Sequence, residues 1–307
     1  MAQLANERIA YFNGEYVPES QVLIPFRDRG FRYGEAVFDT ARTVAHRPFR
    51  LPEHVSRLFR SMRYLDIDAG LTQSEVVEIS EQVLERNLHL IGKDDDYWLT
   101  QRVTPGLADP FASDDTGSPT VIIECVPLPL KPRAPLFRDG VKVQVSSTRR
   151  TPPDSQSPRA KTHNYINLIL ADREVRSVDI EAWAILLDHV GNIAEGLGSN
   201  IFLVRDGVVM TPRSRMVLPG VSRQTVIDLA GGLDLPVQET DIDLFDAFTA
   251  DECFLTSTSL CMVPVASVNG RKIGSVLPGP VTQQLIEAYK EELDFDFVGQ
   301  FLRRLED

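Results

Sequence analysis

The chain has 307 residues, of which 43% are hydrophobic and 25% are charged. This composition is typical of a soluble globular protein and excludes a disordered or fibrous one. The formal net charge of −12 argues against nucleic acids and anionic membranes as partners, because the field of the protein would repel both.

The N-terminal sequence MAQLANERIAYF has no basic start followed by an apolar stretch, and no segment approaches about 18 consecutive apolar residues. We therefore expect neither an export signal nor a membrane span. The three cysteines, Cys125, Cys253 and Cys261, lack CxxC spacing, which argues against a disulfide framework and against a zinc site. The sequence predicts a reducing cytoplasmic location and no bound metal.

The first elements in chain order read as strands. Residues 9–17, IAYFNGEYV, predict a β-hairpin, because an Asn-Gly pair separates two alternating apolar runs. Residues 37–44, VFDTARTV, alternate with period two, so Phe38 and Arg42 share one face and Asp39 lies on the other.

Two helices are expected next. Residues 51–67 carry apolar side chains at helical spacing, with Arg57 on the flank of the apolar stripe. Residues 72–88 begin with a capping box of Thr72 and Glu75.

Four prolines within residues 126–137 mark the best linker candidate in the chain. We therefore predict an N-terminal domain over 1–130, a linker over 131–135 and a C-terminal domain over 136–307. The fold class is α+β. Further strands are expected at 96–104, 119–128, 141–147, 181–196 and 200–212, and further helices at 222–231 and 280–293.

Lys161 lies directly before an apolar run in RAKTHNYINLIL (159–170) and next to Thr162, a helix-capping type. A lysine at the edge of an apolar segment usually extends its charge into water. Alternatively, a partly desolvated amine with a lowered pKa is a nucleophile toward carbonyl groups. The lysine alone leaves both interpretations open.

Three further segments allow either a ligand or an ordinary structural role. Ser222 stands at the start of a predicted helix, where it could bind an anion such as phosphate or cap its own helix. The hydroxyl run at 256–259 could bind phosphate or form a plain turn. Glu195, flanked by Gly196 and Gly198, is either a solvated turn residue or a carboxylate presented into a crevice. A lysine, a carboxylate and phosphate donors together suit pyridoxal 5'-phosphate.

Seven motifs in this order resemble the fold-type IV pyridoxal-phosphate enzymes, from about residue 9 to residue 290. This family includes branched-chain aminotransferases, D-amino acid aminotransferases, (R)-selective amine transaminases and aminodeoxychorismate lyases. The resemblance implies a two-domain fold, D-amino acid aminotransferase-like, with a small N-terminal and a larger C-terminal domain. The motifs are YFNGEYVP, DRGFRYGEAVFDTAR, LPEHVSRL, AKTHNYIN, AEGLGSNIFLV, LPGVSR and ADECFLTSTS.

Carried over position by position, the resemblance implies that Lys161 forms a Schiff base with pyridoxal 5'-phosphate and also moves the substrate's Cα proton. Tyr165, one helical turn on, would bond the phenolic oxygen, and Glu195 would pair with the pyridine nitrogen. The remaining implied cofactor contacts are with the phosphate, from Arg57, Val221, Ser222 and Thr258, and with the ring, from Leu218.

The substrate residues implied by the branched-chain pattern are Tyr33, Phe38, Arg42, Tyr97, Arg102, Ser259 and Leu260. The chain departs from that pattern in three places. It has Thr40-Ala41 in place of Gly-Ile, it has Leu99 where an arginine commonly stands, and Ser259-Leu260 replaces two small residues. Either Arg42 or Arg102 could therefore bind the substrate carboxylate.

The leading hypothesis is an aminotransferase that acts on a branched-chain L-amino acid and a 2-oxo acid such as 2-oxoglutarate. The alternatives are a D-amino acid or (R)-amine transaminase, an aminodeoxychorismate lyase, and a cofactor-binding protein without turnover. The family also implies a homodimer whose active site is completed by a neighbouring loop, here residues 104–117.

Overall fold

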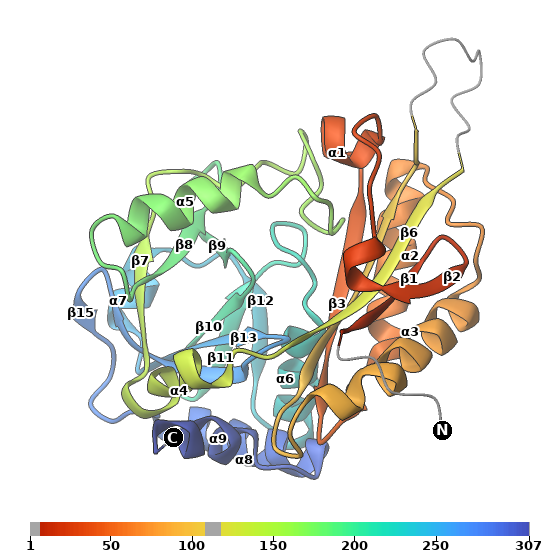
Figure 1. Ribbon diagram of the computed structural model, residues 1–307. Coiled ribbons are helices and arrows are strands. Elements are labelled where there is room, and N and C mark those ends of the chain that lie inside the picture. Colours follow the sequence, from red (N-terminus) through yellow and green to blue (C-terminus); the bar gives the residue numbers. More distant parts are fainter. Residues whose placement is uncertain (1–6, 108–117, 307) are drawn as a thin grey trace. The chain divides into compact units, whose positions relative to one another are not determined.

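The computed structural model describes residues 7–107 and 118–306 and divides the chain into two compact units (Figure 1). The chain crosses from the first unit to the second after Leu128, close to the end of the predicted N-terminal domain. It then returns once to the first unit with a short segment that carries Lys161. The first unit comprises Met1–Leu128 and Ala160–Asn164, and the second comprises Pro129–Arg159 and Tyr165–Asp307.

The first unit is built on an antiparallel sheet with the strand order β2-β1-β6-β5-β3-β4. The predicted hairpin is confirmed, and Asn13 and Gly14 have φ angles of 49° and 104°, as a two-residue turn between strands requires. The strands are β1 (Ile9–Phe12), β2 (Glu15–Pro18), β3 (Val37–Val44), β4 (Arg47–Pro48), β5 (Tyr97–Thr104) and β6 (Thr120–Pro127).

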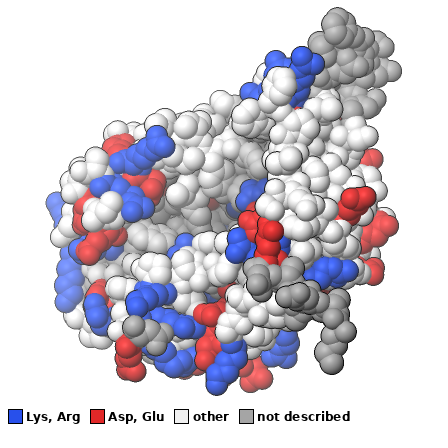
Figure 2. Space-filling view, in the orientation of Figure 1, with Lys and Arg blue, Asp and Glu red and all other residues white. Residues whose placement is uncertain are grey.

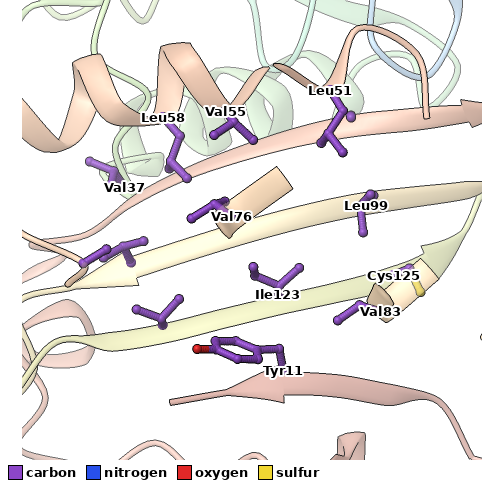
Figure 3. Close-up of a cluster of buried hydrophobic side chains, with 14 of the residues drawn as sticks. Tyr11, Val37, Leu51, Val55, Leu58, Val76, Val83, Leu99, Ile123 and Cys125 are labelled. Atoms are coloured by element: carbon purple, nitrogen blue, oxygen red, sulfur yellow. The ribbon is translucent and has the colours of Figure 1, made fainter. Parts of the chain in front are cut away.

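Helices α2 (Leu51–Leu65) and α3 (Gln73–Asn87) pack on the sheet of this unit. The predicted capping box is confirmed, because Thr72 and Glu75 exchange both bonds. Figure 3 shows how side chains of the helices and strands interdigitate in one apolar core. A short helix, α1 (Arg29–Tyr33), precedes β3.

The second unit contains a sheet with the order β12-β11-β10-β13-β14-β7-β8-β9. Strand β9 also pairs with β10 through Glu195 and Asn200, so the part of the sheet from β10 to β9 closes on itself. The strands are β7 (Val141–Val145), β8 (Trp183–Leu187), β9 (Ile193–Gly196), β10 (Asn200–Arg205), β11 (Val208–Pro212), β12 (Val237–Thr240), β13 (Glu252–Ser257), β14 (Cys261–Val268) and β15 (Arg271–Lys272), which pairs with β14.

The helices of the second unit pack on different parts of this sheet. Helix α5 contacts β8 (Figure 1), whereas α4 contacts β14 and α6 contacts β13. The helices are α4 (Leu130–Asp139), α5 (Ile166–Arg176), α6 (Val221–Gly232), α7 (Leu244–Thr249), α8 (Pro280–Leu293) and α9 (Phe297–Leu302).

The predicted linker over 131–135 is wrong, because these residues lie inside α4. Proline is tolerated in the first turn of a helix, where the missing N–H has no intrahelical acceptor. Pro135 lies further in, but Leu130 and Ala134 are buried and share one face at i, i+4 spacing. Burial of that face stabilises the helix despite its prolines.

Candidate active site

Lys161 lies on an extended segment beside β3 in the first unit. The Phe38 amide donates to the Lys161 carbonyl at 3.0 Å, and the Lys161 amide donates to Ser61 Oγ at 3.0 Å. Helix α5 begins only at Ile166, with Tyr165 as its N-cap. The expectation that Lys161 and Tyr165 are separated by one helical turn is therefore wrong.

The Lys161 amine lies 4.4 Å from the centroid of the Phe38 ring. Phe38 pairs with Arg102 across β3 and β5, and the Arg102 guanidinium lies 5.5 Å from the same ring. Arg102 also donates to Glu124 at 3.0 Å. Of the predicted residues in this unit, the structure thus brings together Lys161, Phe38 and Arg102.

His163 lies edge-on to the Phe38 ring, with ring centroids 5.3 Å apart. Burial lowers the pKa of His163 to about 4, and the neighbouring Arg102 charge acts in the same direction. A neutral imidazole therefore adjoins the apolar ring.

Arg57 is buried in a cluster with Asp39 and His54. Its Nε and Nη2 donate to Asp39 at 2.8 and 2.7 Å, and His54 Nδ1 lies 2.7 Å from Asp39 Oδ1. Because a carboxylate only accepts, His54 Nδ1 is the donor. Burial opposes ionisation of Asp39, but the Arg57 charge and both neighbours' hydrogen bonds hold its pKa well below the usual range.

Tyr97 is a core residue of the first unit. Its side chain is fully buried, and its hydroxyl donates to the Asn87 carbonyl at 2.9 Å. Burial raises the pKa of Tyr97 to about 12. The prediction that Tyr97 contacts the substrate is wrong. Side chains alternate along β5, so Tyr97 points to the core and Arg102 to the opposite face.

Two other predicted substrate residues are placed differently. Arg42 is 1% exposed, and its guanidinium donates to the Thr43 carbonyl at 2.8 Å and lies 3.5 Å from Asp96. Tyr33, at the end of α1, is 56% exposed. Their roles toward a substrate stay predictions.

Glu195 is the centre of a polar cluster in the second unit, where it is 4% exposed. Arg150 Nε donates to its Oε1 at 2.8 Å. The Leu218 amide and Asn200 Nδ2 donate to Oε2 at 2.9 and 3.5 Å. Because a carboxylate has about four acceptor sites, these donors leave room for one more at Oε1. Glu195 and Leu218 were among the predicted cofactor residues, whereas Arg150 and Asn200 were not.

The first turn of α6 adjoins this cluster. Asn200 Nδ2 donates to the Leu218 carbonyl at 3.0 Å, and a Cβ on Gly220 would lie 2.2 Å from Asn200 Oδ1, so any larger residue there would displace the Asn200 side chain. Gly220 is the N-cap and no side chain caps the helix. The interpretation of Ser222 as the cap is therefore wrong, and the backbone amides of Val221 and Ser222 lie in an uncapped first turn.

The hydroxyl run follows β13 into the turn before β14. The Leu260 amide donates to Ser257 Oγ at 3.2 Å, and Arg133 donates to Ser259 Oγ. Thr256 Oγ1 is buried, with no hydrogen-bond partner among the described residues. Residues 258–260 form a turn, which leaves the phosphate interpretation untested, and the Leu260 amide has an internal acceptor.

The surface and the described residues as a whole add two observations. Figure 2 shows acidic and basic side chains interspersed over one face. In 7–107 and 118–306, no cluster of three or more potential metal ligands occurs, and no helix is long and apolar enough to cross a membrane.

Known proteins with similar sequences cover nearly the whole chain. A putative branched-chain-amino-acid aminotransferase of Methanocaldococcus jannaschii is 35% identical over 92% of this chain and 95% of its own. The aminodeoxychorismate lyase of Bacillus subtilis is 33% identical over 92% of this chain and 94% of its own.

Among solved structures, the branched-chain amino acid aminotransferase of Escherichia coli has a TM-score of 0.84 and 29% identity, covering 93% of this chain and 94% of its own. Another branched-chain amino acid aminotransferase, solved with pyridoxamine 5'-phosphate, has a TM-score of 0.83 and 29% identity, and 95% of each chain is covered. The family model for class IV amino-transferases matches residues 36–268. On this evidence the chain belongs to the class IV aminotransferases, with the two-domain α+β fold of fold type IV.

Proposed function

We propose that the protein is a pyridoxal-phosphate-dependent aminotransferase that transfers the amino group of a branched-chain L-amino acid to a 2-oxo acid such as 2-oxoglutarate. One observation carries the proposal. In the second unit, Asn200 lies next to both a buried carboxylate with acceptor capacity at Oε1 and the N-cap of an uncapped helix. Such a pair suits a ligand with a protonated ring nitrogen at one end and a phosphate at the other.

The residues present fit pyridoxal 5'-phosphate. When bound, this group supplies an aldehyde that condenses with amines and a ring that accepts the electrons released at the substrate's Cα. Glu195 would hold the proton on the ring nitrogen through Oε1. The amides of Val221 and Ser222 would bind the phosphate, where the helix dipole favours an anion.

Other cofactor contacts follow the family pattern. Arg57 and Thr258 would add to the phosphate contacts, Leu218 would pack on the ring, and Tyr165 would donate to the phenolic oxygen. Asp39 holds the Arg57 guanidinium in one orientation by two hydrogen bonds, which suits recognition of a planar or tetrahedral anion.

Lys161 has two tasks in this proposal. Its amine would hold the aldehyde carbon of the cofactor covalently. The same amine, when free, would act as the general base that takes the proton from the substrate's Cα and as the general acid that returns a proton. The Phe38 ring, 4.4 Å from the amine, keeps one side of the amine out of water.

The substrate preference rests on Phe38 and Arg102. An aliphatic side chain suits the apolar ring, and a carboxylate suits the guanidinium beside it. Arg102 is the better candidate than Arg42, because the Arg42 guanidinium already donates to the Thr43 carbonyl and lies 3.5 Å from Asp96, whereas Arg102 lies beside the Phe38 ring. Ser259, Leu260 and Tyr33 are retained as further substrate contacts of the family pattern.

A homodimer completes the proposal. The first unit exposes a group of large apolar side chains that monomers rarely leave in water, and a second copy of the chain would cover them. Much of the 104–117 loop, expected to complete the partner's site, lies outside the described residues. The exposed side chains are Leu23, Ile24, Phe26, Phe31 and Leu107.

We also propose a reducing compartment, the cytoplasm. Cys125, Cys253 and Cys261 are free thiols and buried, and burial raises the pKa of Cys125 to about 12. Such thiols react slowly, so they behave as small core residues.

The test is a donor screen on the purified protein. The absorbance of the cofactor is followed after single additions of L-leucine, L-isoleucine, L-valine, D-alanine and (R)-1-phenylethylamine, without an acceptor. A branched-chain L-amino acid should convert the spectrum fastest, and 2-oxoglutarate should restore it. A faster D-alanine or (R)-amine would overturn the substrate but not the cofactor chemistry.

The second candidate is an aminodeoxychorismate lyase, which the Bacillus subtilis relative favours. This activity would use the same lysine to eliminate pyruvate. Pyruvate accumulating from aminodeoxychorismate without any amino acceptor would identify the lyase, whereas the transaminase requires an acceptor for every turnover.

A further inference from the structure

The segment that carries Arg150 follows β7 in the second unit. The Ser146 amide donates to the Ile185 carbonyl at 3.0 Å, and the Arg150 amide donates to the Leu187 carbonyl at 2.8 Å. The segment therefore continues beside β8 after the strand has ended. Side chains of α5 supply further contacts to it.

One side chain of α5 holds the backbone on both sides of Arg150. Asn167 Nδ2 donates to the Arg149 carbonyl at 2.5 Å, and the Thr151 amide donates to Asn167 Oδ1 at 3.3 Å. A carboxamide can do this because it carries a donor and an acceptor at the same end. An aspartate would keep the acceptor and lose the donor.

A second side chain of α5 holds the start of the same segment. Glu174 accepts from Ser146 Oγ at 2.6 Å, from the Ser147 amide at 2.7 Å and from the Thr148 amide at 3.3 Å. We call Asn167, Glu174 and residues 146–151 together the α5 clamp. The clamp leaves the backbone of Arg150 little freedom.

The side chain of Arg150 uses this fixed backbone. It is 13% exposed, and its Nε lies 2.8 Å from Glu195 Oε1. Among the described residues, Leu218 and Asn200 hold the other oxygen, Oε2. The orientation of Oε1 therefore depends on Arg150, and Oε1 is the atom with capacity for a further donor.

We propose that Asn167 is a positioning residue for cofactor binding, acting through Arg150 on Glu195. Asn167 touches neither substrate nor cofactor in this scheme. The inference rests on the proposed function, in which Oε1 faces the ring nitrogen. In this scheme α5, whose N-cap is Tyr165, also positions Arg150, which binds the Glu195 carboxylate.

The test is a double-mutant cycle on the apoprotein titrated with pyridoxal 5'-phosphate. The variants are Asn167→Ala, Asn167→Asp, Arg150→Met and the double variant Asn167→Ala with Arg150→Met. Arg173→Ala, on the exposed side of the same helix, is the matched control. The readouts are the dissociation constant of the cofactor, the pH dependence of its absorbance when bound, and the melting temperature of the apoprotein.

Asn167→Ala should weaken cofactor binding by about threefold to tenfold, the range expected for one lost hydrogen-bonding group. The pH profile of the absorbance should shift in the same direction as in Arg150→Met. In the Arg150→Met background, Asn167→Ala should have no further effect on either readout, because the two act as one unit. Asn167→Asp should behave like Asn167→Ala, and Arg173→Ala like the wild type.

The proposal is overturned if Asn167→Ala weakens binding by the same factor with and without Arg150, since Asn167 would then act independently. If Asn167→Ala fails to fold, the isosteric Asn167→Asp replaces it, and its effect on cofactor affinity is compared in the wild-type and Arg150→Met backgrounds. A failure of the proposed function looks different, because borohydride would then fix no cofactor on Lys161 in the wild type.

Discussion

The two units each contain a buried carboxylate paired with an arginine, but the roles of the two partners are exchanged. In the first unit, Asp39 accepts two hydrogen bonds from Arg57 and orients its guanidinium, which is the group expected to bind the phosphate. In the second unit, Arg150 donates a hydrogen bond to Glu195 and orients its carboxylate, which is the group expected to face the ring nitrogen. Each charge that is expected to bind the ligand is thus fixed by an opposite charge for which no ligand contact is proposed.

The difference lies in how completely each pair is withdrawn from water. Asp39 and Arg57 are 0% and 2% exposed, and they sit beside the apolar core of the first unit. Arg150 is 13% exposed and is held by a surface clamp. A buried pair costs much when one partner is removed, whereas a partly exposed pair is compensated by water. Removal of the supporting partner should therefore cost more folding free energy for the Asp39–Arg57 pair than for the Arg150–Glu195 pair.

The largest effect is expected from Asp39→Ala. This change leaves the Arg57 guanidinium buried without its carboxylate, which costs about 3–5 kcal/mol of folding free energy. Urea unfolding of the apoprotein should show a lower midpoint. Glu124→Ala, which removes a half-buried carboxylate on the same sheet, is the control and should cost about 1 kcal/mol or less. Equal losses in the two variants would show that Asp39 has no special role.

The next effect is expected from Glu195→Gln. A neutral amide cannot hold the pyridinium proton by charge, so kcat should fall about 100-fold, equivalent to about 2.7 kcal/mol. The variant should still bind the cofactor, since the shape is kept. Glu181→Gln, an exposed carboxylate of the same unit, serves as the control. An unchanged kcat in Glu195→Gln would remove this residue from the site.

The contrast between the pairs also explains what the sequence could predict. Period-two alternation placed Asp39 on the strand face opposite Phe38 and Arg42, but it predicted neither the burial of Asp39 nor its pairing with Arg57. Local patterns also predicted the hairpin and both capping-box residues. These features depend on neighbours within a few residues.

Arg150 carried no such signal, because its partner Glu195 is 45 residues away and the contact exists only after β7 and β8 have paired. Tyr97 was misassigned because a resemblance motif, rather than its position in the alternation, determined its role. The linker was misplaced because proline content says nothing about the burial of Leu130 and Ala134. Contacts between distant segments are set by the sheet, which a single sequence does not specify.

A smaller effect is expected from Arg57→Lys. Lysine cannot reproduce the two-bond contact with Asp39 or present a planar fork to a phosphate. The dissociation constant of pyridoxal 5'-phosphate should rise about tenfold, or about 1.4 kcal/mol, while kcat at saturating cofactor stays close to that of the wild type. Titration of the apoprotein with the cofactor measures the dissociation constant, and the reaction rate at saturating cofactor gives kcat. A fall in kcat without a change in affinity would contradict the phosphate role.

The smallest effect is expected from Glu174→Gln, and it should depend on pH. Hydrogen bonds from Ser146 and Ser147 lower the pKa of Glu174 from 4.5 to about 2. A carboxyl group whose pKa is lower in the folded state stabilises the protein above its unfolded pKa and loses this contribution as the pH falls toward the folded value. Because Glu174 is half-exposed, the contribution should be below about 1 kcal/mol. The melting temperature of the wild type should therefore exceed that of Glu174→Gln above pH 4.5, and the difference should shrink steadily toward pH 2. A difference that stays constant over this range would show that the carboxylate charge does not hold the α5 clamp.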